Sequence, residues 1–251
     1  MVIIYEMAKI SSFLDRFKDF LNTSLILIKC KQRIMPKEDM VKINLGSALV
    51  VAKGWINVDS SLNAFFSGFP RPLIGLLYYF SGSKKIYSKQ EYINILKSST
   101  FIHHNLQYGI PFPDGSADYI YTSHFLEHFS KDDAETFLKE CLRVLTKNGR
   151  IRICVPDLEY VVSVYLEGKK DRALDYFYTN SLTKNFNDHR YMYDFDLLKK
   201  SLSKTGFSLI EKCAYKQGHM PDIDKLDQKP EETLFVEAVK QSEKAYEYPG
   251  H

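Results

Sequence analysis

Strand-like and helix-like segments alternate along most of this chain. Apolar runs typical of strands lie at 41–45, 54–59, 101–106, 119–122, 150–155, 208–214 and 233–239. Segments with a helical period lie between several of them, at 130–148, 157–165 and 194–206. Strands joined through helices pair in parallel, because the connection has to cross back over the sheet. The order therefore predicts an α/β fold, with a mostly parallel sheet and helices on its faces.

The helix predicted at 130–148 has the strongest local signals. Ser130 followed by Asp133 is a capping-box pattern, and apolar residues then recur at helical spacing. The pair Asn148-Gly149 is a stop signal, because both residues accept the left-handed backbone that ends a helix.

The chain divides into one domain with an addition at each end. Residues 1–40 are predicted as an N-terminal helical extension, since apolar residues repeat at helical spacing through 8–33. Residues 41–240 form the domain, and 241–251 form a C-terminal tail. Within the domain, 62–100 is an irregular, aromatic-rich insertion. It predicts a lid, a dimer contact or a membrane-surface contact, with burial against its own domain as the plain alternative.

Charge and cysteine content exclude several classes of protein. The 34 Lys and Arg residues against 31 Asp and Glu leave a net charge of +3 without a long basic run, so no nucleic-acid partner is expected. The four cysteines lie far apart and form no Cys-x-x-Cys pair, which predicts neither a disulfide framework nor a metal site. Cys141 and Cys154 fall in a helix and a strand pattern, where buried free thiols are expected.

No segment is typical of a signal peptide or a membrane span. The start of the chain lacks a charged region, and the apolar stretch 64–80 is broken by Pro70, Arg71 and Pro72. We expect a soluble cytoplasmic protein. Peripheral membrane contact and the oligomeric state stay open.

Several short motifs occur in an order that resembles one known family. They are NLGS at 44–47, GWINVD at 54–59, IPFPDGSAD at 110–118, SHFLEH at 123–128, and RVL at 143–145 with VPDL at 155–158. Together they resemble the type 11 group of class I S-adenosylmethionine-dependent methyltransferases, which is often associated with surface polysaccharide synthesis. The resemblance spans roughly residues 41 to 240. It implies a Rossmann-like seven-stranded sheet with an antiparallel C-terminal strand, and S-adenosyl-L-methionine as the cofactor.

The resemblance implies a cofactor site at the carboxyl ends of the first three strands. Gly46 would let the cofactor approach the backbone, and Asp59 would accept hydrogen bonds from the ribose hydroxyls. Asn105 and Leu106 would flank the adenine, and Asn44 would hydrogen-bond the methionyl end. Structural alternatives stay open: a turn glycine, a capping aspartate and a turn asparagine.

The loop after the first strand departs from the family pattern at two positions. The resemblance leads one to expect an acidic residue at 44 and a glycine at 48, whereas this chain has Asn44 and Ala48. An amide cannot offset the ammonium charge of the cofactor, and the methyl group narrows the loop. Weak or absent cofactor affinity is the consequence to test.

Three residues are candidates for the chemistry. His124 follows the fourth strand, where the transferred methyl would be presented, so it could contact the cofactor and serve as base toward a hydroxyl acceptor. Glu127 and His128 lie within one helical turn of it, and one of them could orient the cofactor or His124, with a structural hydrogen bond as the alternative. His189 is a second candidate base, with a loop histidine as its plain alternative. Asp157 reaches the same edge, but it is also well placed to cap a helix.

Two functions of different classes follow. The first is a methyltransferase that acts on oxygen of a small molecule or glycan. The second is a non-catalytic methyltransferase-like protein that binds a partner, which Asn44 and Ala48 favour. A nicotinamide dehydrogenase is disfavoured, because no Gly-x-Gly-x-x-Gly follows the first strand.

Overall fold

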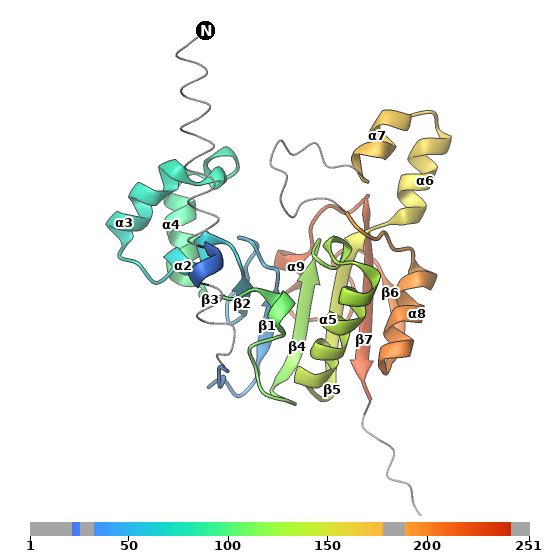
Figure 1. Cartoon of the computed structure of the whole chain (residues 1–251), viewed down its shortest axis with the longest axis horizontal. Helices are drawn as coiled ribbons and strands as arrows, with labels where there is room; N and C mark the ends of the chain where they lie inside the picture. Colours follow the sequence, from blue (N-terminus) through green and yellow to red (C-terminus); the bar gives the residue numbers. More distant parts are fainter. Residues whose placement is uncertain (1–21, 26–32, 178–188, 242–251) are drawn as a thin grey trace, which may run out of the picture.

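The computed structural model describes residues 22–25, 33–177 and 189–241, and a seven-stranded sheet runs through its centre (Figure 1). The strands are β1 (Lys42–Leu45), β2 (Ile56–Asp59), β3 (Thr100–His103), β4 (Ala117–Ser123), β5 (Leu145–Pro156), β6 (Phe207–Cys213) and β7 (Thr233–Lys240). Their order is β3-β2-β1-β4-β5-β7-β6. Only β7 runs antiparallel to its neighbours, β5 and β6. The predicted Rossmann-like sheet with an antiparallel C-terminal strand is confirmed.

Side chains on alternate strand positions divide the sheet into two unlike faces, because successive residues of a strand point to opposite sides. One face is aliphatic and belongs to the main core, with Ile43 and Leu45 of β1 and Ile151 and Ile153 of β5 among its members. The other face carries buried polar and aromatic side chains, listed here as Asn44, Asn57, Tyr121, Arg152, Cys154 and Glu237.

Two long helices cover the aliphatic face. They are α5 (Lys131–Val144), whose Ser130 cap accepts from the Asp133 amide as predicted, and α8 (Phe195–Thr205), which ends at Gly206. The predicted end of α5 at Asn148-Gly149 was wrong. The helix stops at Val144, because Leu145 turns extended and pairs with β4 while its side chain enters the core.

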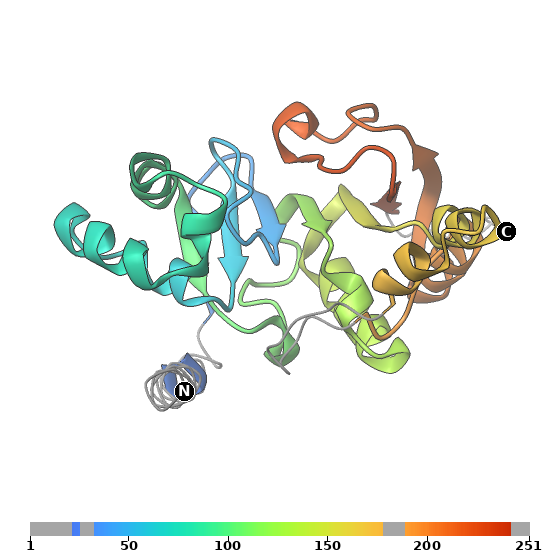
Figure 2. The ribbon, with the colours of Figure 1, turned by 90° about the horizontal axis from the view of Figure 1, so that it is seen from above.

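Helices also occupy the insertion at 62–100, so the prediction that it is irregular was wrong. It contains α2 (Leu62–Phe66), α3 (Arg71–Leu77), two short 3₁₀ turns (Tyr78–Phe80 and Gly82–Lys85) and α4 (Lys89–Ser98). Ser88 and Glu91 form a reciprocal capping box that starts α4. Figure 2 shows these helices gathered at one end of the sheet, with α6 to α8 at the other end.

The short link between β1 and β2 contains no helix. The helices of the insertion at 62–100 take the place of a helix that would connect these strands. Leu49 of the link packs with Ile74 of α3 and with Tyr92 and Leu96 of α4 in a separate apolar cluster. Helices therefore lie on both faces of the sheet, as predicted.

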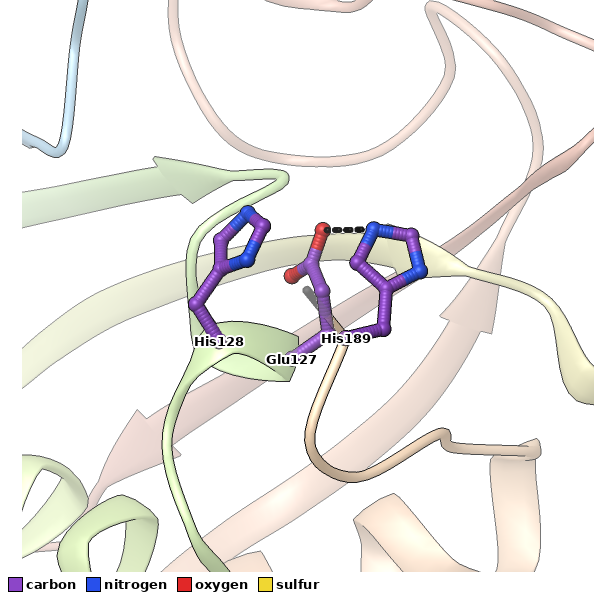
Figure 3. Close-up of side chains that lie close together, drawn as sticks. All are labelled: Glu127, His128 and His189. Carbon is purple, nitrogen blue, oxygen red and sulfur yellow. Dashed lines mark ion pairs between the residues drawn. The ribbon is translucent and has the colours of Figure 1, made fainter. Parts of the chain in front are cut away.

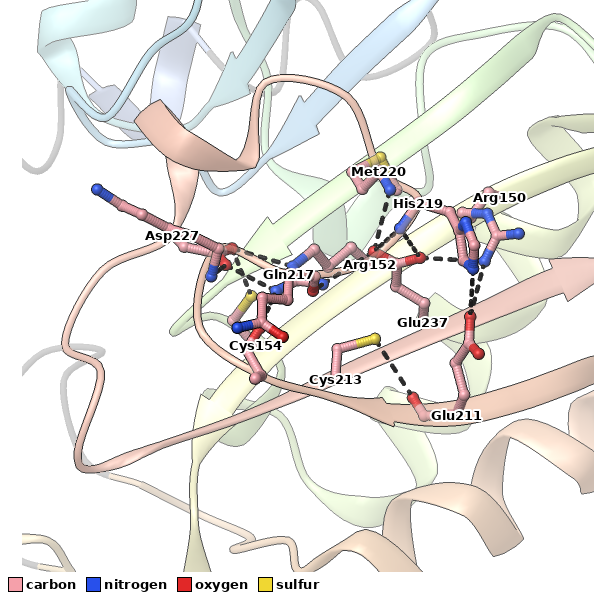
Figure 4. Close-up of polar contacts among 12 residues, drawn as sticks. Arg150, Arg152, Cys154, Glu211, Cys213, Gln217, His219, Met220, Asp227 and Glu237 are labelled. Atoms are coloured by element: carbon pink, nitrogen blue, oxygen red, sulfur yellow. Dashed lines mark hydrogen bonds and ion pairs between the residues drawn. The ribbon is translucent and has the colours of Figure 1, made fainter.

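Residues 214–232, with the one-turn helix α9 (Ile223–Leu226), cover the polar face of β5 and β7. Arg152 of β5 is fully buried and forms ion pairs with Asp227 (2.6 Å) and Glu237 (2.8 Å) (Figure 4). Its guanidinium also donates to the carbonyls of Ala214 and Gln217. Four hydrogen bonds from one side chain thus hold this segment on the sheet, and a fifth reaches Glu237 of β7.

The carboxyl edge of the sheet carries α6 (Leu158–Leu166) and α7 (Lys170–Asp175). Cys141 and Cys154 are buried free thiols, as predicted, and burial raises the pKa of Cys154 to about 12. Most of the predicted N-terminal helix, 8–33, lies outside the described residues, as does Cys30. Among the residues that are described, no helix is both long and apolar enough to cross a bilayer.

Candidate functional site at the carboxyl edge of the sheet

Asp59 joins the loops that leave β1 and β2. Its carboxylate accepts from the backbone amide of Ala48 (2.8 Å) and from that of Ser61 (2.7 Å). The amide of Gly46 in turn donates to the carbonyl of Val58 (2.9 Å). Each carboxylate oxygen has more than one lone pair, so both can still accept from a ligand hydroxyl. Asp59 therefore ties the two loops together at the end of β2, and its role toward a ribose stays a prediction.

Gly46 is required for a reason that the sequence did not reveal. Its φ of +68° lies in the left-handed region, and a Cβ here would come within 2.5 Å of the Phe125 ring. The glycine therefore admits the Phe125 side chain, which belongs to the loop after β4. Close approach of a ligand to the backbone remains a prediction.

Asn44 is committed to the fold. Its amide group donates to the carbonyl of Val50 (2.8 Å) and to Asn57 Oδ1 (3.1 Å), and the residue is 2% exposed. These bonds fix the loop between β1 and β2. Ala48 adopts a φ of +46° in that loop, where a glycine would be unstrained. The departures at 44 and 48 are thus accommodated without loss of the loop, and the role of Asn44 toward a cofactor stays a prediction.

Two buried hydroxyls near Asp59 have no hydrogen-bond partner among residues 22–25, 33–177 and 189–241. They are Ser47 Oγ, after Gly46, and Ser61 Oγ, at the start of α2. Buried polar groups are nearly always satisfied, so each exception indicates a missing partner. A polar ligand at this edge would supply one, which fits the hydroxyl-rich and charged parts of S-adenosylmethionine.

Asn22 reaches the same edge, and sequence reasoning did not single it out. Its amide donates to the carbonyl of Ser60 (2.9 Å), and its Oδ1 lies 2.8 Å from His103 Nε2. Part of the N-terminal region therefore contacts the ends of β2 and β3. A polar residue in a helical period carries no signal of such a long-range contact.

Asn105 and Leu106 follow β3 and begin the 3₁₀ turn η3 (Leu106–Tyr108). Asn105 Oδ1 accepts from the Gln107 amide (2.9 Å), which is a capping role. Leu106 lines a cavity of about 330 Å³ with the rings of Phe129 and Phe137. This volume lies at the lower end of the range for small-molecule sites.

His124 stands at the end of β4 in a strained backbone conformation, with a φ of +49°. Its Nε2 lies 3.1 Å from Thr233 Oγ1 of β7, and its Nδ1 lies 3.6 Å from Glu127 Oε1. The backbone amide of His124 donates to the carbonyl of Cys154 (2.8 Å). Strain of this kind is often kept where a side chain must point into a functional site.

Glu127 lies in the 3₁₀ turn η4 (Leu126–His128) and is fully buried. Within the described part of the chain, neither carboxylate oxygen has a hydrogen-bond partner. The backbone amides of Arg190 and Tyr191 donate to its carbonyl, which brings His189 to within 3.9 Å of its Oε1. The tertiary structure thus unites the SHFLEH motif with a histidine some sixty residues away in the sequence.

The contacts of His189 identify one ring nitrogen that carries a proton. Its Nδ1 lies at hydrogen-bonding distance from the carbonyl of Tyr176, which can only accept, so Nδ1 carries the proton. Burial lowers the pKa of His189, although Glu127 acts in the opposite direction. The other ring nitrogen, Nε2, lies 3.9 Å from Glu127 Oε1.

Asp157 caps α6, since its Oδ1 accepts from the Glu159 amide (3.0 Å). Burial raises the pKa of its carboxyl group, and Lys212 Nζ lies 3.8 Å away. A backbone bridge to Tyr193 ties the end of β5 to the segment that follows His189. The capping alternative accounts for the observed contacts, and a catalytic role for Asp157 stays a prediction.

Part of the chain matches a known protein family. Residues 82–153 match the type 11 family model described as a methyltransferase domain. The match covers β3, β4 and most of β5, and it leaves the Gly46 loop and Asp59 outside it. No curated protein matches the chain.

Solved structures with a similar arrangement are distant in sequence. One is a Thermotoga maritima S-adenosylmethionine-dependent methyltransferase described as a possible histamine N-methyltransferase, 17% identical over 96% of both chains, with a TM-score of 0.45. Another, from Aquifex aeolicus, is 13% identical over 86% of this chain and 88% of its own, with a TM-score of 0.41. Over residues 82–153 the chain is thus similar to a methyltransferase domain, and S-adenosylmethionine is the cofactor that this similarity indicates.

Proposed function

We propose that the protein transfers the methyl group of S-adenosylmethionine to an oxygen atom of a small molecule or glycan. The observation that carries the proposal is the single polar edge where β1, β2 and β4 end, with Asp59 and the orphan hydroxyls at one end and His124 at the other. Parallel strands deliver their carboxyl ends to one edge, which is where ligands bind in open α/β sheets.

Asp59 and the loops it joins would hold the cofactor. Its carboxylate would accept hydrogen bonds from the ribose hydroxyls. The hydroxyls of Ser47 and Ser61 would form hydrogen bonds with polar groups of the cofactor, and Leu106 would pack against the adenine. When bound, the cofactor supplies an already activated methyl group. The protein then has to hold the acceptor in line with the C–S bond and remove a proton.

His124 is the base that we propose for that proton, with His189 as the second candidate. The side chain of His124 is 21% exposed to solvent, so an acceptor can reach it. Thr233 Oγ1 holds the ring through Nε2, while Nδ1 faces Glu127 Oε1 at 3.6 Å. His124→Gln should keep S-adenosylmethionine affinity and lose turnover, and loss of cofactor affinity instead would assign His124 to the cofactor.

Calorimetric titration with S-adenosylmethionine and S-adenosylhomocysteine tests the cofactor site directly. Asp59→Ala should weaken both by about tenfold or more, since a charge-assisted hydrogen bond contributes about 1.5–3 kcal/mol. Asp196→Ala, an exposed aspartate on α8, is the matched control and should bind like wild type. Absence of binding at millimolar ligand would refute the enzyme and favour the partner-binding alternative.

A further inference from the structure

The charge of the buried Glu127 carboxylate is not compensated by hydrogen bonds from the described residues. Its side chain is 0% exposed, and both carboxylate oxygens lack a hydrogen bond among the described residues. The nearest cationic candidates are two histidines, at 3.6 Å and 3.9 Å. A buried carboxylate without a cation or donors is strongly destabilising, so such groups are paired or coordinate metals.

His189 does not compensate this charge. Its Nδ1–H donates to the Tyr176 carbonyl, and its Nε2 lies 3.9 Å from Glu127 Oε1, which is too far for a hydrogen bond. A metal cation between Nε2 and the carboxylate would satisfy both groups. Histidines that bind metals commonly donate their other ring N–H to a backbone carbonyl in this way.

His128 completes a set of three ligands. One ligand atom from each of Glu127, His128 and His189 lies within 4.8 Å of the other two. Figure 3 shows the three side chains pointing the same way, with the carboxylate between the two imidazoles. Tetrahedral zinc ligands lie about 3.4 Å apart at ordinary bond lengths, so small side-chain rotations would close the set around an ion.

We propose that Glu127, His128 and His189 bind a divalent transition-metal ion, of the zinc, iron or manganese kind. Two imidazoles and one carboxylate form the ligand set that these metals accept while leaving further positions open. The prediction that there is no metal site was based on the spacing of the cysteines. This set contains no cysteine, and its members come from two segments that are far apart in the chain. Glu211, Cys213 and Glu237 also lie close together, but Arg150 and Arg152 already neutralise Glu237.

The ion would act on the methyl acceptor, an inference that rests on the proposed function. An open coordination position beside His124 would bind the acceptor oxygen and lower the pKa of its hydroxyl. The hydroxyl proton passes to His124 while the oxygen attacks the methyl carbon. The C–S bond breaks and its electron pair stays on sulfur, which yields the neutral thioether.

Metal binding can be measured without any acceptor. The full-length protein, free of a polyhistidine tag and stripped with a chelator, is titrated with Co²⁺ by visible absorption and with Zn²⁺ by calorimetry. Wild type should bind one equivalent, and Glu127→Gln and His189→Ala should each weaken binding by about tenfold or more. His219→Ala is the matched control, because this histidine is exposed and outside the set; it should bind like wild type.

Thermal unfolding shows whether the variants remain folded. Metal-free Glu127→Gln should be at least as stable as metal-free wild type, since it removes an uncompensated buried charge. Added Zn²⁺ should raise the Tm of wild type but not that of the variant. No metal binding by wild type, or undiminished binding by Glu127→Gln, would overturn the site.

The cofactor titration separates this proposal from the proposed function. Glu127→Gln that weakens S-adenosylmethionine but not Co²⁺ would assign the carboxylate to the sulfonium charge and overturn the metal site. Co²⁺ binding that depends on Glu127, without any cofactor binding, would support the metal site and contradict the methyltransferase.

Discussion

Replacement of Arg152 by methionine tests whether the buried ion cluster holds residues 214–232 on the sheet. The change removes five hydrogen bonds and the cation between two fully buried carboxylates. Glu237 would keep Arg150 and the backbone amides of His219 and Met220. Asp227 would keep only neutral donors, namely the Lys216 amide, the Tyr121 hydroxyl and the Cys154 thiol. Asp227 is therefore the charge left without a partner.

Breaking a buried ion pair from one side costs about 3–5 kcal/mol, which is a large part of the 5–15 kcal/mol that stabilises a typical domain. We expect Arg152→Met to lower the free energy of unfolding by that amount, measured by urea denaturation with far-UV circular dichroism. Adding Asp227→Asn should restore about 1 kcal/mol or more, because the stranded charge is removed.

Arg152→Lys is the conservative control. It keeps the charge but offers three donors in place of the guanidinium fork, so its loss should lie between wild type and Arg152→Met. A loss below about 1 kcal/mol for Arg152→Met, or no recovery in the double variant, would refute the reasoning. Either result would mean that water or rearrangement compensates Asp227.

Three further predictions use other parts of the fold. Gly46→Ala should lower stability by about 1–3 kcal/mol and weaken S-adenosylmethionine binding, because its Cβ would meet the Phe125 ring at 2.5 Å; thermal unfolding and calorimetry measure both, and an unchanged Tm would contradict it. Burial lowers the pKa of His104 below 6.5, so the unfolded chain takes up a proton at a higher pH than the folded protein does. The contribution of His104 to stability is therefore present above about pH 6.5 and is lost as the pH falls. The unfolding free energy of wild type should drop more steeply toward about pH 5 than that of His104→Gln, and equal slopes would refute this. Ser88→Ala should cost about 1 kcal/mol by removing the capping box of α4, whereas Ser130→Ala on α5 offers the comparison, and a loss for neither would argue against both caps.

Local patterns were enough to predict the strands, the sheet class and the first residues of α5, α6 and α8. The apolar run at 150–155 lies within β5, and the Ser130 cap started α5 where it was predicted. The end of α5 was mispredicted, because the burial of Leu145 and its pairing with β4 outweigh a local stop signal at Asn148-Gly149. The helices of 62–100 were missed because apolar residues on several sides obscure the helical period.

The candidate site divides in the same way. Asp59, His124 and Glu127 sit at strand ends that the sequence marks by motif, whereas Asn22 and His189 reach the site only through the folded chain. The same holds for Arg152, whose partners come from a distant segment and an antiparallel strand. Periodicity reports which side of an element is buried, because that depends on neighbours within a few residues. Which charges meet inside the protein depends on chain segments that only tertiary packing brings together.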